Sequence, residues 1–143
     1  MYIPRRFFTK GRVSLSPDLL MRSLIVEDNQ VMSEFLRRAL SELPFEAIHV
    51  AHTGEETRTR LMTDHYDILL IDWILPDSSG LDIVKGLRSG EKYRNTPIIM
   101  ITGRNQTEDL VQAIQAGVDD YVIKPVRPVM LKEKVSKLLG WTT

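Results

Sequence analysis

The chain has 143 residues, of which 43% are hydrophobic and 27% are charged, so it is long enough to bury a substantial core as one domain. It contains no cysteine, which excludes disulfides, thiolate zinc sites and cysteine nucleophiles. No apolar run approaches ~18 residues and the first residues lack an apolar signal core, so we expect a cytoplasmic protein without membrane insertion.

The charge is unevenly distributed, although the formal net charge is zero. Residues 1–22 carry five basic side chains and one acidic side chain, and Pro4, Gly11 and Pro17 interrupt them. We predict that residues 1–22 are a flexible basic extension and that residues 23–143 form the folded domain. The remainder is mildly acidic, which does not favour nucleic-acid binding as the main activity.

From residue 24 onward, short apolar runs alternate with segments of helical periodicity. The first strand is Leu24–Val26, and the helix after it places apolar residues from Val31 and Phe35 to Leu43 on one face and closes at Pro44. The later predicted elements follow in chain order: strand 47–51, helix 55–62, strand 68–71, a helix around 81–87, strand 98–101, a helix around 110–114, strand 121–123 and a helix around 129–139. This alternation predicts an α/β fold, a parallel sheet with helices on both faces.

Polar side chains follow the ends of four predicted strands, and in a parallel sheet these ends lie at one edge. They are Glu27 and Asp28 after the first strand, Asp72 after the third, Thr102 after the fourth and Lys124 after the fifth. Open α/β sheets bind their ligands at this edge. The sequence therefore predicts a site that gathers three carboxylates, a hydroxyl and an ammonium group.

Three carboxylates in one cleft require a proton or a cation. Two of them ~4 Å apart repel by about 4 kcal/mol at an effective dielectric constant of 20. Oxygen ligands without histidine or cysteine favour Mg²⁺, with Mn²⁺ also possible. Because Mg²⁺ is commonly shared between one or two carboxylates and phosphate oxygens, the site is suited to a phosphoryl group.

Over residues 23–143 the sequence resembles the response-regulator receiver domain of two-component signalling. The acidic pair Glu27-Asp28 follows the first strand, and Pro76 and Gly80 lie four and eight residues after Asp72. Thr102 ends the fourth strand, and residues 116–121 lead into Lys124-Pro125. The resemblance implies a doubly wound, flavodoxin-like (βα)5 fold with strand order 2-1-3-4-5, for which a bacterial chemotaxis regulator is a known example.

The resemblance also implies a role for each matching residue. Asp72 is expected to accept a phosphoryl group from phosphohistidine, and Lys124 and Thr102 to contact that group. Tyr121 is expected to be an aromatic switch that turns as Thr102 moves, and the Lys124-Pro125 peptide bond is expected to be cis. The expected Mg²⁺ ligands are Asp28, Asp72 and the backbone carbonyl of Trp73, with Glu27 acting through water.

The family also implies partners and a lifetime for the phosphorylated form. The expected partners are a sensor histidine kinase or histidine phosphotransfer protein and a downstream protein target, with the chain a monomer or a phosphorylation-dependent dimer. No output domain follows in this chain, and the only reactions expected are its own phosphorylation and slow autodephosphorylation. Autodephosphorylation is predicted to be slow because of the residues at positions 74 and 104. Receiver domains that dephosphorylate quickly have groups there that orient water, whereas this chain has Ile74 and Arg104.

Two other classes of protein share part of this pattern. A magnesium-dependent phosphatase of the haloacid dehalogenase type uses a similar aspartate nucleophile, but it needs a second Asp at the position of Ile74. A flavodoxin-like nucleotide binder needs a Gly- or Ser/Thr-rich loop after the first strand, where Glu27-Asp28 instead repels phosphate.

Overall fold

Five parallel strands form the central sheet of the computed structural model, which describes residues 3–4, 8–9, 12–13 and 20–142. In spatial order they are β5 (Phe45–Ala51), β4 (Met21–Val26), β6 (Ile68–Ile71), β7 (Ile98–Thr102) and β8 (Asp120–Ile123). Numbered along the chain, this is the predicted order 2-1-3-4-5. The first strand begins at Met21 rather than Leu24, and the other four begin and end within two residues of their predicted bounds.

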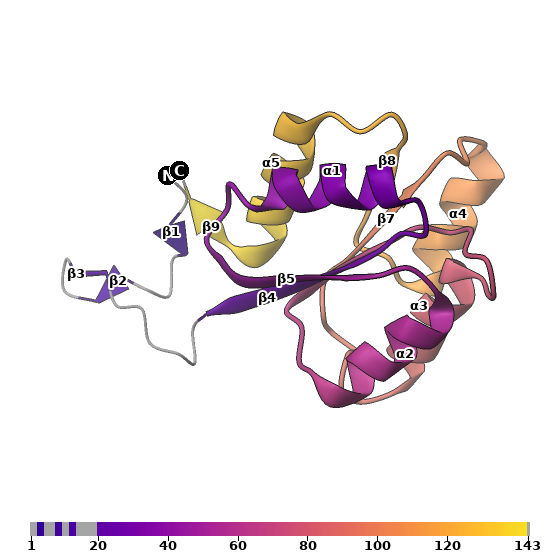
Figure 1. The fold of residues 1–143 in the computed structure, drawn as a ribbon, viewed down its shortest axis with the longest axis horizontal. Helices are drawn as coiled ribbons and strands as arrows, with labels where there is room; N and C mark the ends of the chain where they lie inside the picture. Colours follow the sequence, from indigo (N-terminus) through magenta and orange to yellow (C-terminus); the bar gives the residue numbers. More distant parts are fainter. Residues whose placement is uncertain (1–2, 5–7, 10–11, 14–19, 143) are drawn as a thin grey trace.

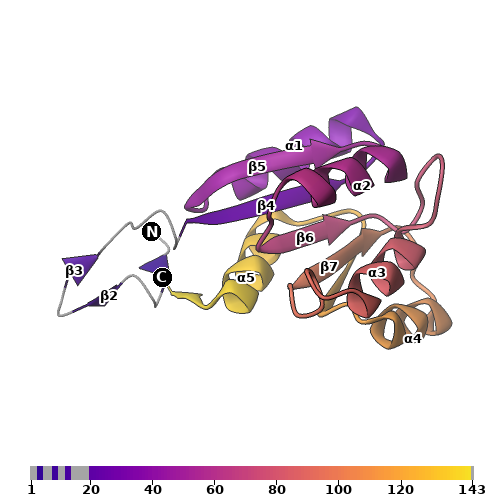
Figure 2. The same cartoon turned by 90° about the horizontal axis from the view of Figure 1, so that it is seen from below.

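Helices cover both faces of the sheet, as Figures 1 and 2 show. Their bounds are α1 (Gln30–Leu40), α2 (Gly54–Thr63), α3 (Gly80–Ser89), α4 (Thr107–Ala116) and α5 (Pro128–Leu139). Helices α1 and α5 lie together on one face, and α2, α3 and α4 lie on the other. Each face has its own apolar core, so β6, whose four residues are all buried, is covered from both sides.

The apolar faces of two helices are less buried than their periodicity suggests. In α1, Leu36 and Leu40 are buried, whereas Val31 is 82% exposed and Phe35 is 38% exposed. This helix ends at Leu40, four residues before Pro44. In α4 the buried side chains are those of Asp109 and the small residues Ala113 and Ala116, and the larger apolar side chains face solvent.

Short strands lie near the two ends of the described chain. Strand β1 (Ile3–Pro4) pairs antiparallel with β9 (Trp141–Thr142), and β2 (Phe8–Thr9) pairs with β3 (Arg12–Val13). Residues 1–2, 5–7, 10–11 and 14–19 of the predicted extension lie outside the described residues, so its flexibility stays a prediction. Within the described ranges, no helix combines the length and apolar composition needed to cross a membrane.

Arg88, in the last turn of α3, joins three segments on the side of β7 where that strand begins. Its guanidinium donates to the carbonyls of Tyr93, Arg94 and Thr96, all in the loop before β7. It also donates to the Gly117 carbonyl after α4 and pairs with the Asp119 carboxylate at 2.9 Å. The end of α3, the start of β7 and the turn before β8 are therefore fixed to one another.

Candidate phosphoryl-transfer site

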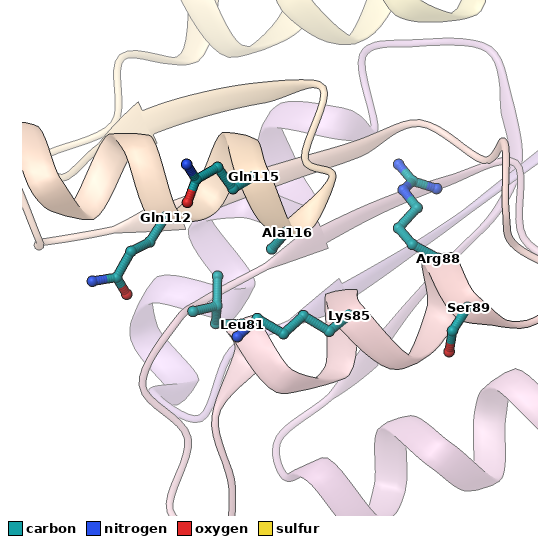
Figure 3. Close-up of a pocket in the computed structure, with 7 residues that line it drawn as sticks. All are labelled: Leu81, Lys85, Arg88, Ser89, Gln112, Gln115 and Ala116. Atoms are coloured by element: carbon teal, nitrogen blue, oxygen red, sulfur yellow. The ribbon is translucent and has the colours of Figure 1, made fainter.

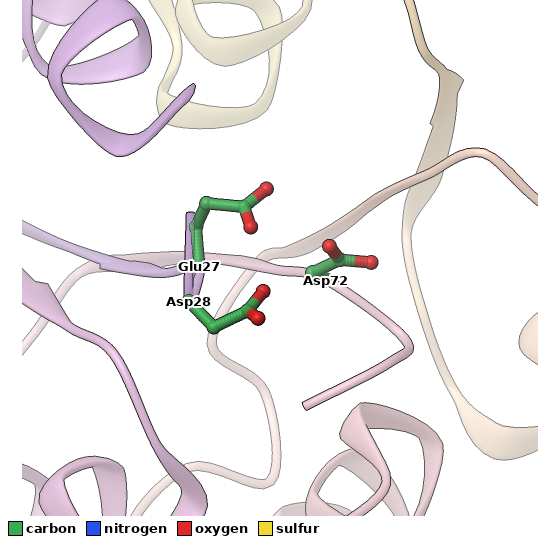
Figure 4. A group of neighbouring side chains, drawn as sticks. All are labelled: Glu27, Asp28 and Asp72. Atoms are coloured by element: carbon green, nitrogen blue, oxygen red, sulfur yellow. The ribbon is translucent and has the colours of Figure 1, made fainter. Parts of the chain in front are cut away.

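Three carboxylates meet at the carboxyl ends of β4 and β6, as Figure 4 shows. Glu27 and Asp28 follow β4, Asp72 follows β6, and these strands are neighbours in the sheet. One oxygen from each carboxylate lies within 4.8 Å of the others. Glu27 and Asp72 are buried and Asp28 is exposed, so the group opens to solvent on one side.

Lys124 partly neutralises this acidic group. It follows β8, and its Nζ donates to Glu27 Oε1 at 2.6 Å and to Asp72 Oδ2 at 2.8 Å. Burial alone lowers the pKa of Lys124, but its hydrogen bonds to Asp72 and Glu27 outweigh that effect and raise the pKa. Burial raises the pKa of Glu27, and repulsion from Asp72 adds to that, while hydrogen bonds from Lys124 and the Asn29 amide oppose it. One ammonium group does not balance three carboxylates, and the remaining negative charge favours a bound cation.

The loop after Asp72 is held in a defined position by two contacts. The Asp77 carboxylate accepts hydrogen bonds from the amides of Gly54 and Glu55 at the start of α2, which lowers the pKa of Asp77. Gly80 begins α3 directly against the site, because a Cβ built at Gly80 would lie 1.9 Å from the Asp72 carbonyl oxygen. Only glycine therefore allows the chain to return this closely to Asp72.

The Trp73 carbonyl accepts a hydrogen bond from the Gly80 amide at 2.7 Å. A carbonyl oxygen has a second lone pair, so this bond leaves Trp73 able to serve as a metal ligand. The side chain of Ile74 is 61% exposed, and its amide donates to Asp72 Oδ1 at 3.3 Å.

Thr102 and Tyr121, which the sequence predicts as switch residues, lie on β7 and β8. Thr102 is buried at the end of β7, and its carbonyl accepts a hydrogen bond from the Lys124 amide. Tyr121 is half-buried in β8, and its hydroxyl donates to the Arg104 carbonyl at 2.7 Å. The Arg104 side chain binds Asp109 and stacks on Trp73. The Lys124-Pro125 peptide bond is cis, as expected.

A groove between α3 and α4 is separate from this site, although it is the most voluminous of the described pockets. Leu81, Lys85, Gln112 and Gln115 are among the residues that line it, and Figure 3 shows their side chains. None of the three carboxylates, Lys124 or Thr102 lines it, so it has no part in the chemistry of the strand ends.

Three positioning side chains were not predicted from the sequence: Asp77 and Asp109 near the site, and Arg88 at the opposite end of β7. Asp109 had a local signal, because Gln106 and Asp109 have the spacing of a helix capping box, which the structure contains. Asp77 and Arg88 act on segments more than twenty residues away, and no local pattern indicates such partners.

An open parallel sheet of this strand order is a flavodoxin-like α/β fold, and the carboxylates and lysine at its carboxyl edge form a site suited to a cation and a phosphoryl group. Residues 23–136 match the response regulator receiver domain family. The chain belongs to that family.

Curated relatives agree with this assignment. The chain is 36% identical over 121 residues to chemotaxis protein CheY1 of Helicobacter pylori, covering 84% of this chain and 98% of that protein. It is 32% identical over 118 residues to chemotaxis protein CheY of Pseudomonas aeruginosa, covering 82% of this chain and 95% of that protein.

Solved receiver domains share the fold. One is the receiver domain of a Pseudomonas aeruginosa sensor histidine kinase, with magnesium coordinated in its active-site cleft. It is 27% identical, has a TM-score of 0.76 and matches over 85% of this chain and 98% of that chain. A Francisella response regulator receiver domain is 28% identical, with a TM-score of 0.76 over 83% of this chain and 96% of that chain.

Proposed function

We propose that Asp72 accepts a phosphoryl group from a phosphohistidine and that the resulting aspartyl phosphate changes which proteins the domain binds. The placement of Asp72 carries this proposal: it lies beside two further carboxylates, and its own oxygen is 2.8 Å from the Lys124 ammonium. An Asp72 oxygen attacks phosphorus, the P–N bond breaks, and the histidine ring leaves after taking a proton from water. Lys124 then balances the charge on the phosphoryl oxygens.

Mg²⁺ fits the oxygen donors that these residues offer. Asp28, Asp72 and the Trp73 carbonyl would hold the ion, and Glu27 would reach it through water, as the family resemblance implies. When bound, the ion neutralises charge on the carboxylates and on the phosphoryl oxygens. Mn²⁺ has the same preference for oxygen ligands.

Two exposed apolar surfaces flank the strand ends and support a function in protein binding. One groove beside Lys124 is lined by Val31, Met32 and Phe35 of α1 and by Pro125 and Val126. The other surface comprises Leu110, Val111 and Ile114 of α4 and Ile123 of β8, each at least 40% exposed. We assign the first to the histidine-bearing donor, because it borders Lys124, and the second to the downstream target.

The test is phosphorylation of purified protein by acetyl phosphate with Mg²⁺, followed by intact-protein mass spectrometry. We expect wild type to gain one phosphoryl group and Asp72→Asn to gain none, because the amide is not a nucleophile. Asp82→Asn is the control, because Asp82 is an exposed carboxylate in the first turn of α3. Phosphorylation of Asp72→Asn at the wild-type level would exclude Asp72 as the acceptor.

The phosphatase reading finds no support. Ile74, at the position where that mechanism needs a general acid, has no titratable proton, and the comparisons identify receiver domains.

The division into an extension at residues 1–22 and a domain at 23–143 remains our proposal. The family match begins at residue 23 and β4 begins at Met21.

A further inference from the structure

Arg104 connects three groups around the phosphoacceptor loop. Its guanidinium carbon lies 4.4 Å from the centre of the Trp73 ring. Its Nε and Nη2 donate to Asp109 Oδ1 at 3.1 and 2.8 Å, and its carbonyl accepts the Tyr121 hydroxyl at 2.7 Å. We call Arg104, Trp73, Asp109 and Tyr121 together the Arg104 clasp.

The clasp bridges elements that are far apart in the chain. Trp73 directly follows Asp72, and its ring, under the Arg104 guanidinium, is buried, with 7% of the residue exposed. Asp109 lies in the first turn of α4, where its other oxygen accepts the Gln106 amide. Arg104 therefore ties the phosphoacceptor loop to the start of α4 and to the switch tyrosine at once.

The clasp also limits the movement of Thr102. In this structure Thr102 Oγ1 lies 3.5 Å from the Arg104 amide, so the hydroxyl faces its own loop. Four residues separate Thr102 from the start of α4, and Arg104 is in the middle of them. Turning the Thr102 hydroxyl toward a phosphoryl group breaks its contact with the Arg104 amide. Any movement of the Arg104 backbone that follows weakens the clasp, because stacking and paired hydrogen bonds depend strongly on geometry.

We infer that the Arg104 clasp is a brake: it stabilises the unphosphorylated arrangement of the loop between β7 and α4 and opposes the switch. This inference rests on the proposed phosphorylation of Asp72. A contact present in one state and broken in the other lowers the apparent affinity for any ligand that selects the second state. Removing the clasp should therefore strengthen the binding of a phosphoryl mimic.

The sign of the effect separates this inference from two simpler ones. If Arg104 only supplied positive charge near the site, its loss would weaken the binding of an anionic mimic. If its guanidinium bound a phosphoryl oxygen directly, its loss would also weaken binding. Only a contact that favours the unphosphorylated state predicts tighter binding when it is removed.

The experiment is calorimetric titration of beryllofluoride, a phosphoryl mimic, into protein saturated with Mg²⁺. We expect Arg104→Ala to bind it about five- to tenfold more tightly than wild type. Arg104→Lys keeps the charge but loses the paired hydrogen bonds and the planar stacking, so we expect it to bind more tightly than wild type as well. Arg94→Ala is the matched control, because Arg94 is exposed and its side chain makes one hydrogen bond, to the Gly90 carbonyl. Its affinity should equal that of wild type.

Tryptophan emission gives an independent reading of the clasp. In a Trp141→Phe background Trp73 is the remaining emitter. Before any ligand is added, Arg104→Ala should shift its emission to longer wavelength, because the ring becomes exposed to water. A change in folding alone would not combine this shift with tighter mimic binding.

The outcomes distinguish the brake from the proposed function. Binding by wild type, with equal or weaker binding by either Arg104 variant, would overturn the brake and leave Asp72 as the phosphoacceptor. Failure of wild type to bind beryllofluoride at all would overturn the proposed function and the brake with it.

Discussion

Lys124 has two proposed roles, pairing with the carboxylates and contacting the phosphoryl group, and a substitution can distinguish them. In this structure its ammonium bonds Glu27 and Asp72, and in the proposed phosphorylated form it contacts the phosphoryl group. We expect Lys124→Ala to retain Mg²⁺ binding, because a cation beside the metal ligands is removed. Its affinity for beryllofluoride should fall by about 10- to 100-fold, the value of a hydrogen bond to a charged group.

Both affinities can be measured on the same protein, Mg²⁺ by Trp73 emission in the Trp141→Phe background and the mimic by calorimetry. Lys85→Ala makes the same change in net charge at an exposed position of α3. If Lys124→Ala bound the mimic as tightly as Lys85→Ala, the assignment of Lys124 as a phosphoryl contact would fail.

Ile74 should prolong the phosphorylated state. Its side chain is largely exposed beside Asp72 and has no group that orients water for attack on phosphorus. General acid–base assistance of this kind typically contributes about 10²–10⁴-fold, and we expect orientation alone in Ile74→Asn to hasten loss of phosphate by a smaller factor, about tenfold. The decay of radiolabelled phosphate measures this rate, and equal rates for wild type and variant would refute the role of Ile74.

The sequence was sufficient for the residues that do the proposed chemistry and insufficient for those that position them. Asp72 and Lys124 end apolar runs, and the geometry of a parallel sheet brings such ends together. Arg104 was expected only to affect the lifetime of the phosphorylated form, and its binding to Asp109 and stacking on Trp73 were not predicted. Side-chain partners of that kind depend on how a loop packs against a helix, and such packing leaves no periodic pattern in the sequence.

At the scale of the element, α3 contains a matched pair of glycines. Gly80, at its start, is buried, and a Cβ there would collide with the Asp72 backbone. Gly86, in the middle of the same helix, is exposed, with nothing within 4 Å of its Cβ position. We expect Gly80→Ala to destabilise the protein by about 1–3 kcal/mol and to weaken Mg²⁺ binding.

Gly86→Ala is the control, and it should stabilise the protein by about 0.5–1 kcal/mol, because alanine is the better helix former. Urea denaturation gives both free energies of unfolding. Equal effects of the two substitutions would show that close approach to Asp72 is not what position 80 requires.

The sequence predicted that α1 and α4 are helices, but it did not predict how many of their apolar side chains are buried. Periodicity identifies the residues that share a face, yet the width of the covered stripe depends on neighbouring elements. In α4 the contact with the rest of the domain is made through Ala113 and Ala116, which bring the helix close and leave Leu110 and Ile114 in solvent. An apolar pattern in a helix can therefore describe an exposed binding surface as well as a core.

At the scale of the whole molecule, the strand order followed from the family resemblance, and the alternation of apolar runs with helical segments indicated the layers. The pairing of β1 with β9 was not predicted. Two-residue strands have no periodicity to detect, and this pair joins segments from opposite ends of the described chain.

Arg88 has a mechanical consequence for how the domain switches. Its bonds to Thr96 and Asp119, together with the bond from the Ile98 amide to Asp119, anchor the beginning of β7. The other end of this strand carries Thr102, so we expect the displacement on phosphorylation to be confined to the segment after Thr102. On adding Mg²⁺ and beryllofluoride, hydrogen exchange should change most at residues 103–107 and least at 96–99. A uniform change along 96–107 would show that the whole strand slides, and the effect of phosphorylation would then extend to the far edge of the sheet.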